Sequence, residues 1–82
     1  MRKRHKRQSE QFLSDIGDAI RLRRVDSGLS QDELGKRCSV HRSYITEIEN
    51  GQRNVSILTI EKIASALSLE AWQLLRFDGV EQ

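Results

Sequence analysis

The sequence of 82 residues has no proline and only one cysteine, and it lacks any long apolar run. Because proline ends or kinks helices, its absence, with 32% charged residues and long amphipathic periods, predicts an all-helical domain. A chain of this length forms one domain with a modest core, so dimerisation would add stability. The lone Cys38 occupies an apolar position of the pattern described below. We expect a small buried hydrophobic residue there, not a reactive thiol or half of a disulfide.

The sequence also lacks the long apolar segments of membrane proteins and the residue sets of common enzyme active sites. No apolar run approaches 18 residues and no signal-peptide core is found, so we expect a cytoplasmic protein with no membrane contact. The sequence has no Ser/His/Asp or Cys/His/acid set, no Gly-rich phosphate loop and no metal cluster. Cys38 and His41 are only two possible zinc ligands, and a zinc site needs three or four. We therefore expect no enzyme activity, cofactor, metal ion or small-molecule substrate.

Positive charge is concentrated near the N-terminus. Residues 2–7 hold five of the 14 Lys and Arg residues and no acid, which leaves nine basic against 12 acidic residues, a net charge of −3, for the remainder. We expect a basic arm at 1–8 that is disordered in isolation, one domain at 9–78 and a tail at 79–82. The arm is either a solvated tail or a segment that follows DNA phosphates or enters a minor groove. The domain itself can attract a polyanion only through basic residues grouped on one face.

The stretch of residues 30–54 organises the chain. Leu34 and Cys38 are four residues apart and share one helix face, whereas Ile45 and Ile48 are three apart and share another. Two short helices that close on a common core at a steep angle form a helix-turn-helix unit.

The ends of these helices, and three further helices, are also marked in the sequence. Ser30 and Glu33 form an S-x-x-E capping box, and Gly28 and Gly51 suit left-handed positions after helix ends. Gly17 allows a neighbouring helix to approach closely. The apolar stripes outside the helix-turn-helix unit are Phe12, Leu13, Ile16 and Ile20, and then Ile60, Ile63, Ala64 and Leu67. The five expected helices span about 9–27, 31–38, 42–50, 56–67 and 70–77.

Polar residues form one strip on the outer face of the helix expected at 42–50. They are Arg42, Ser43, Thr46, Glu47 and Asn50. Such a face is usually only solvated, but a recognition helix presents the side chains of its first turn to base edges in a major groove. Arg42 can bond both O6 and N7 of guanine, and Ser43 and Thr46 can meet bases or phosphates. Glu47 either accepts a hydrogen bond from cytosine N4 or stays solvated.

A second set of residues is expected to bind DNA phosphates. It consists of Gln31, His41, Tyr44, Asn50, Gln52, Arg53 and Asn54. Gln31 begins a helix whose amides favour anions, and His41 either caps the next helix or touches a phosphate. Tyr44 can donate its hydroxyl to a phosphate, and the alternative is partial burial in the core. The loop at 50–54 offers backbone amides and polar side chains, a suitable phosphate clamp.

The last helix carries more apolar surface than one small core can hide on one face. Its apolar residues are Trp72, Leu74, Leu75 and Phe77, within eight residues. An aromatic-rich patch near a terminus predicts a two-fold dimer contact, and the alternative is a lid over the monomer core.

Residues from about 16 to 75 resemble the lambda-repressor-like (Cro/XRE-type) helix-turn-helix family. The matching segments include Gly28-Leu29-Ser30-Gln31, Ser43-Tyr44-Ile45, Ile48-Glu49-Asn50-Gly51 and Ile63-Ala64. Within the family, Arg42-Ser43-Tyr44-Ile45 followed by Gly51-Gln52-Arg53-Asn54-Val55-Ser56 is most similar to the controller proteins of restriction–modification systems. The chain departs from the family pattern at Gly35, where Ala is preferred, and at Ser39, where the turn usually has Gly.

The resemblance implies an all-α, five-helix domain with the helix-turn-helix in helices 2 and 3. It implies a homodimeric regulator of transcription that binds a pseudo-palindromic operator in double-stranded DNA. Such a regulator activates and represses its own gene, and RNA polymerase is a candidate further partner. It also implies an ion pair of Arg24 with Glu49 that ties the first helix to the recognition helix. The alternative is an antitoxin-like or phage-repressor-like protein whose role includes binding a protein partner.

Overall fold

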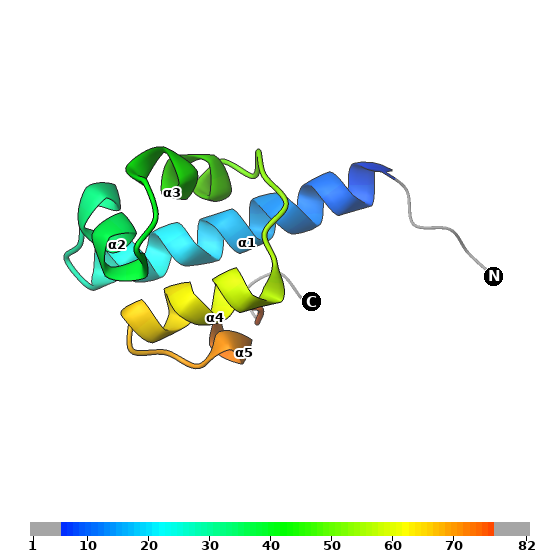
Figure 1. Ribbon diagram of the computed structural model, residues 1–82. Coiled ribbons are helices and arrows are strands. Elements are labelled where there is room, and N and C mark those ends of the chain that lie inside the picture. The colour runs from blue at the N-terminus through cyan, green and yellow to red at the C-terminus, as the bar shows by residue number, and fades with distance from the viewer. Residues whose placement is uncertain (1–5, 77–82) are drawn as a thin grey trace.

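Helices make up all the regular structure in the computed structural model, which describes residues 6–76. They are α1 (Lys6–Asp26), α2 (Gln31–Cys38), α3 (Arg42–Glu49), α4 (Ile57–Ala66) and α5 (Ala71–Leu74) (Figure 1). The all-helical prediction with five helices is confirmed over these residues. Two bounds differ from expectation by more than one residue: α1 begins three residues before Ser9, and α5 ends at Leu74 instead of near 77.

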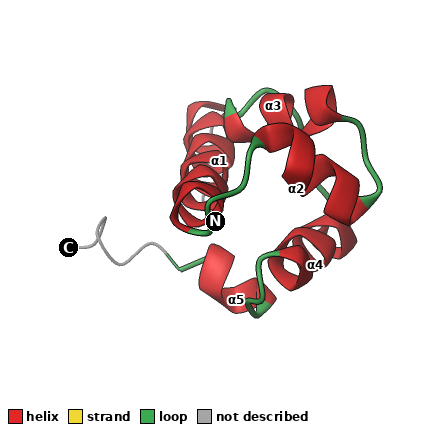
Figure 2. Ribbon diagram, turned by 90° about the vertical axis from the view of Figure 1, so that its left-hand side faces the viewer, coloured by secondary structure: helices red, strands yellow, loops and turns green. Residues whose placement is uncertain are grey.

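The helices pack around one interior, as Figure 2 shows. α2 and α3 pack against each other, α1 lies against α3, and α4 contacts both α2 and α5. The N-terminal part of α1 extends beyond the other helices (Figure 1). This arrangement leaves α3 on the surface, with α1 and α2 supporting it from the inner side.

The core contains nearly all the residues of the predicted apolar stripes. Its buried members are Ile16, Ile20, Leu34, Cys38, Ile45, Ile48, Ile60, Ile63, Ala64, Leu67 and Leu74. Phe12 is a correction, because its side chain is 46% exposed. It lies one helical turn before Ile16, the first buried core residue of α1, beside Ser9, Leu13 and Asn54. Leu13 is half-buried.

Cys38 is a buried free cysteine, as its position in the pattern predicted. Its Sγ lies 3.9 Å from the carbonyl oxygen of Lys62, at the contact of α2 with α4. Burial raises the pKa of the Cys38 thiol, which keeps it protonated and poorly reactive.

Local signals set the helix ends as expected. The Ser30 hydroxyl accepts from the Glu33 amide at 3.0 Å, and the Glu33 carboxylate accepts from the Ser30 amide at 2.8 Å, so the capping box is complete. Gly28 and Gly51 have φ of 74° and 70°, the left-handed conformation that glycine adopts without strain. Ser39 holds φ 61° at the end of α2 without that freedom.

Two other glycines permit close approach of the backbone. A Cβ at Gly17 would lie 2.5 Å from the carbonyl oxygens of Ile48 and Glu49, so α1 and α3 are as close as they are only because Gly17 has no side chain. This confirms the role expected for Gly17. A Cβ at Gly35 would lie 2.8 Å from the carbonyl oxygen of Val40, which accounts for glycine where related sequences prefer alanine.

Candidate nucleic-acid interface

Helix α3 presents its polar strip to solvent. Ile45 and Ile48 are buried beneath it. Arg42, Ser43 and Asn50 are exposed, whereas the other two strip residues, Thr46 and Glu47, are half-buried. No hydrogen bond or ion pair involves the side chain of Arg42 within the described part of the chain, so its guanidinium is available to a ligand.

The first turn of α3 is held by a side-chain cap. His41 Nδ1 accepts from the Ser43 amide at 3.2 Å and lies 3.0 Å from Ser43 Oγ. Of the two roles considered for His41, the cap is therefore present. The exposed His41 ring remains on the same surface as Arg42.

The far end of α3 is anchored by an ion pair with α1. Arg24 Nε and Nη2 donate to the two carboxylate oxygens of Glu49 at 2.6 and 3.0 Å, and Arg24 Nη1 donates to the Leu29 carbonyl at 2.8 Å. The Glu49 side chain is only 1% exposed. These hydrogen bonds with Glu49 raise the pKa of Arg24, against the opposing effect of burial. The pair that the resemblance implied is present, and it fixes how the end of α3 sits on the body.

Gln31 joins this network through its side-chain amide, and the second N–H of Nε2 remains for the expected phosphate contact. Its Nε2 donates to Glu49 Oε1 at 3.0 Å, and its Oε1 accepts from the Thr46 hydroxyl at 2.7 Å. The Thr46 hydroxyl also lies 3.2 Å from the carbonyl oxygen of Arg42. Sequence spacing gave no signal for this link, because it depends on how α2 crosses α3. With its hydroxyl engaged, Thr46 has its methyl group left for a base.

Glu47, Arg53 and Tyr44 form a second cluster, on the solvent side. Arg53 Nε donates to Glu47 Oε1 at 2.8 Å, and Nη2 lies 2.7 Å from the same oxygen in an ion pair. The guanidinium carbon lies 4.8 Å from the centre of the Tyr44 ring, which is itself half-buried against the core. The sequence assigns Glu47 to base reading and the other two residues to phosphate binding, and it gives no signal of their contact. The backbone bond from the Gln52 amide to the Glu47 carbonyl, at 2.9 Å, brings the loop back to α3.

The loop after α3 offers polar side chains to a DNA phosphate, but it has fewer free backbone amides than expected. The backbone amides of Asn50, Gly51 and Gln52 already donate to carbonyls of the last turn of α3. They are therefore not available to a phosphate, which corrects the expectation of a clamp built partly on them. The side chains of Asn50, Gln52 and Asn54 are exposed around the turn.

The residues expected at a dimer contact divide into different environments. Trp72 is 57% exposed and Leu75 is half-buried. Leu74 is fully buried in the monomer core, so its assignment to a contact surface was wrong: the short α5 turns it inward. Phe77 lies outside the described residues. Arg76 Cζ lies 5.9 Å from the centre of the Trp72 ring.

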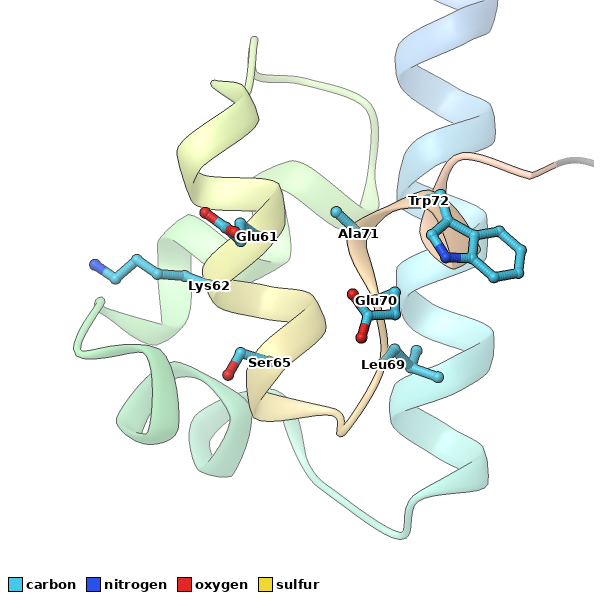
Figure 3. A pocket seen from close by; sticks show the side chains of 7 residues that line it. All are labelled: Glu61, Lys62, Ser65, Leu69, Glu70, Ala71 and Trp72. Atoms are coloured by element: carbon cyan, nitrogen blue, oxygen red, sulfur yellow. The ribbon is translucent and has the colours of Figure 1, made fainter.

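Trp72 lies at one end of a groove of about 530 Å³ between α4 and α5. The groove is lined by Glu61, Lys62, Ser65, Leu69, Glu70, Ala71 and Trp72 (Figure 3). Figure 3 shows the Trp72 ring projecting from α5 on the side away from α4. Helices α4 and α5, which carry the groove and the ring, lie on the opposite side of the fold from α3 (Figure 1).

Two findings concern other kinds of site. Within residues 6–76, no three His, Cys, Asp or Glu side chains gather where they could hold a metal ion. None of the helices in that part of the chain combines the length and hydropathy of a membrane span.

Comparison with known proteins gives consistent matches. A protein-family model described as helix-turn-helix matches residues 20–71. Control protein C.BamHI of Bacillus amyloliquefaciens is 45% identical over 66 residues, covering 79% of this chain and 82% of that protein. The crystal structure of the restriction–modification controller protein C.AhdI from Aeromonas hydrophila has a TM-score of 0.74 at 42% identity, covering 76% of this chain and 94% of that one. The hypothetical transcription factor NHTF from Neisseria has a TM-score of 0.77 at 38% identity, covering 82% and 78% of the two chains.

Proposed function

This chain belongs to the helix-turn-helix family of DNA-binding transcription regulators and is homologous to the controller proteins of restriction–modification systems, and from that premise we propose that it is a homodimer that binds a pseudo-palindromic operator. The dimer would place two α3 helices in successive major grooves, about 34 Å apart on one side of the duplex. Its proposed place of action is the cytoplasm, where such operators lie.

The observation that carries the proposal is the combination of exposure and fixation in α3. The helix presents Arg42, Ser43 and Asn50 to solvent, while its end is tied to α1 through Arg24 and Glu49. A recognition helix needs both properties, because base contacts require side chains that reach into the groove from a rigid support.

The polar residues of this surface divide into base-reading and phosphate-binding groups. Arg42 is proposed to bond O6 and N7 of a guanine, and Ser43 and Thr46 to contact neighbouring bases. Arg53, Tyr44, Asn54 and the exposed amides of Asn50 and Gln52 are proposed to bind phosphates on either side of the groove. His41 can add a phosphate contact from its free ring nitrogen, because Nδ1 is used by the cap.

The proposed dimer contact is centred on Trp72. An aromatic side chain exposed to this extent, beside a groove with both acidic and basic residues at its rim, has the composition of a protein–protein contact. Helix α5 lies opposite α3 (Figure 1), so a second copy bound at α5 would leave the polar strip of each copy open. RNA polymerase is the proposed further partner when the operator lies beside a promoter, as the controller resemblance implies.

Footprinting of the full-length chain on the DNA upstream of its own gene tests the proposal. The expected result is two protected half-sites, separated by about one helical turn, with one dimer per pair of half-sites. Uniform weak protection at all sequences, or a single protected half-site occupied by a monomer, would contradict it.

A further inference from the structure

The guanidinium of Arg53 is held on two sides in the free protein. Its Nε–H donates to one oxygen of Glu47, its Nη2 lies 2.7 Å from that same oxygen, and its Cζ lies 4.8 Å from the centre of the Tyr44 ring. Glu47 thereby occupies one edge of the guanidinium. The Nη1 N–H groups and the second N–H of Nη2 have no acceptor within residues 6–76. An arginine has five N–H donors in a planar fork, so a second bidentate edge remains for an outside ligand.

We infer that Glu47 acts on DNA through Arg53. Together with Tyr44, Glu47 holds the Arg53 guanidinium so that the remaining edge of the guanidinium receives a DNA phosphate. Glu47 is therefore a positioning residue and not a reader of bases. The inference rests on the proposed binding of DNA by this face. This role differs from both alternatives that the sequence left open for Glu47, which were a contact with cytosine N4 and simple solvation.

Three observations favour positioning over direct base contact. Glu47 Oε1 is already engaged by Nε and Nη2 of Arg53, so a cytosine amine that approached this oxygen would compete with the guanidinium. The loop that carries Arg53 is itself fastened to α3 by the bond from the Gln52 amide to the Glu47 carbonyl. The Tyr44 ring is supported by the core, so the platform under the guanidinium is fixed as well.

Positioning matters here because arginine has many rotamers. Ordering a long side chain on binding costs affinity, and a contact that orders the side chain beforehand removes that cost from the binding step. An ion pair exposed as much as this one, with side chains 48% and 41% accessible, adds little to folding, so its variants are expected to fold normally.

The test compares Glu47→Gln with Glu47→Met in the full-length chain. Both remove the carboxylate charge, and both residues suit a helix equally, but only glutamine keeps an oxygen that can accept from Arg53. Affinity is measured on the upstream operator and on an unrelated duplex, each with Arg53 present and with Arg53→Ala. Circular dichroism and thermal unfolding of each variant check that the fold is unchanged.

With Arg53 present, the methionine variant is expected to bind about three- to tenfold more weakly than the glutamine variant on both duplexes, the range that ordering one long side chain supplies. With Arg53→Ala, the two variants are expected to bind equally. The inference is overturned by a difference that persists with Arg53→Ala, since Glu47 would then act on DNA by a route that does not involve Arg53. Equal binding of the two variants with Arg53 present overturns it as well.

The proposed function is judged separately in the same measurements. It requires that the unaltered chain prefer the upstream DNA over the unrelated duplex. Positioning of Arg53 predicts the same glutamine-to-methionine difference on both duplexes, so each claim can fail while the other stands.

Discussion

The carboxylate of Glu49, in the last turn of α3, receives two hydrogen bonds from Arg24 of α1 at 2.6 and 3.0 Å while its side chain is 1% exposed. A buried charge of this kind is stable only with its partner in place. We therefore expect Arg24→Met to lower the free energy of unfolding by about 3–5 kcal/mol, as measured by urea denaturation. Lys36→Met, which breaks the exposed pair with Asp32, is the control and should cost less than about 1 kcal/mol. Equal losses in both variants would mean that burial of the Arg24 pair has no energetic consequence.

Gly17→Ala is expected to destabilise the fold by about 3 kcal/mol, because the new Cβ would meet two backbone oxygens of α3 at 2.5 Å and neither can rotate away. Gly28→Asn is the matched control. Gly28 has φ 74° and nothing within 4 Å of a Cβ, and asparagine tolerates that conformation at less than about 1 kcal/mol. Thermal unfolding of the two variants measures the contrast, and a Gly17→Ala protein as stable as Gly28→Asn would refute the close approach of α1 and α3.

The Glu33 carboxylate links stability to acid pH. Hydrogen bonds from the Ser30 amide and hydroxyl lower the pKa of Glu33 below its ordinary value. A carboxylate whose pKa is lower in the folded state stabilises the fold above its unfolded pKa of about 4.3, and this contribution is lost as the pH falls through the folded pKa. Glu33→Gln keeps the acceptor of the capping box but does not titrate. The difference in the free energy of unfolding between the natural chain and Glu33→Gln, measured by urea denaturation, is expected to shrink between about pH 5 and roughly pH 3. A difference that does not depend on pH would exclude the Glu33 carboxylate as its source.

Trp72→Ala and Leu74→Ala should separate association from folding. Trp72 is 57% exposed, so its truncation is expected to weaken the dimer by about thirtyfold or more in sedimentation experiments, while the dilute monomer unfolds at nearly the same temperature. Leu74 is fully buried, so its truncation is expected to cost about 2–5 kcal/mol of monomer stability. Unchanged association in Trp72→Ala would move the dimer contact away from α5.

Arg42→Ala is expected to cost about 1–3 kcal/mol of binding free energy on the operator and to relax specificity at one base pair. The measurement is a titration against a panel of operators with single base-pair substitutions. Arg53→Ala is the control for a phosphate contact: it should weaken all sequences alike and lower the salt slope by about 1. Uniform weakening by Arg42→Ala would reassign Arg42 to the phosphates.

The features that were predictable from the sequence depend on neighbours along the chain. The capping box of Ser30 and Glu33 and the left-handed Gly28 and Gly51 lie within four residues of the helix ends they set. The apolar spacing that placed Ile45 and Ile48 in the core is local in the same way. These features were predictable because the tertiary packing agrees with the conformations that the local sequence prefers.

The features that were missed depend on how elements meet in space. Gln31 and Thr46 are 15 residues apart, and their bond exists only because α2 crosses α3 at that point. Glu47 and Arg53 are joined by the return of a loop whose path no residue spacing specifies. Leu74 was misplaced because the expected helix was longer than α5, and a longer helix distributes its apolar residues over more of its surface.

The strip on α3 consists of two kinds of position. Thr46 and Glu47 are tied to other elements, whereas the side chains of Arg42 and Asn50 touch no other described side chain through a hydrogen bond or ion pair. A lineage could therefore exchange Arg42 and Asn50 without disturbing the scaffold. Regulators descended from this one can acquire new target sequences by changes at Arg42, the base-reading position of the two, while the tied positions preserve the geometry that any target requires.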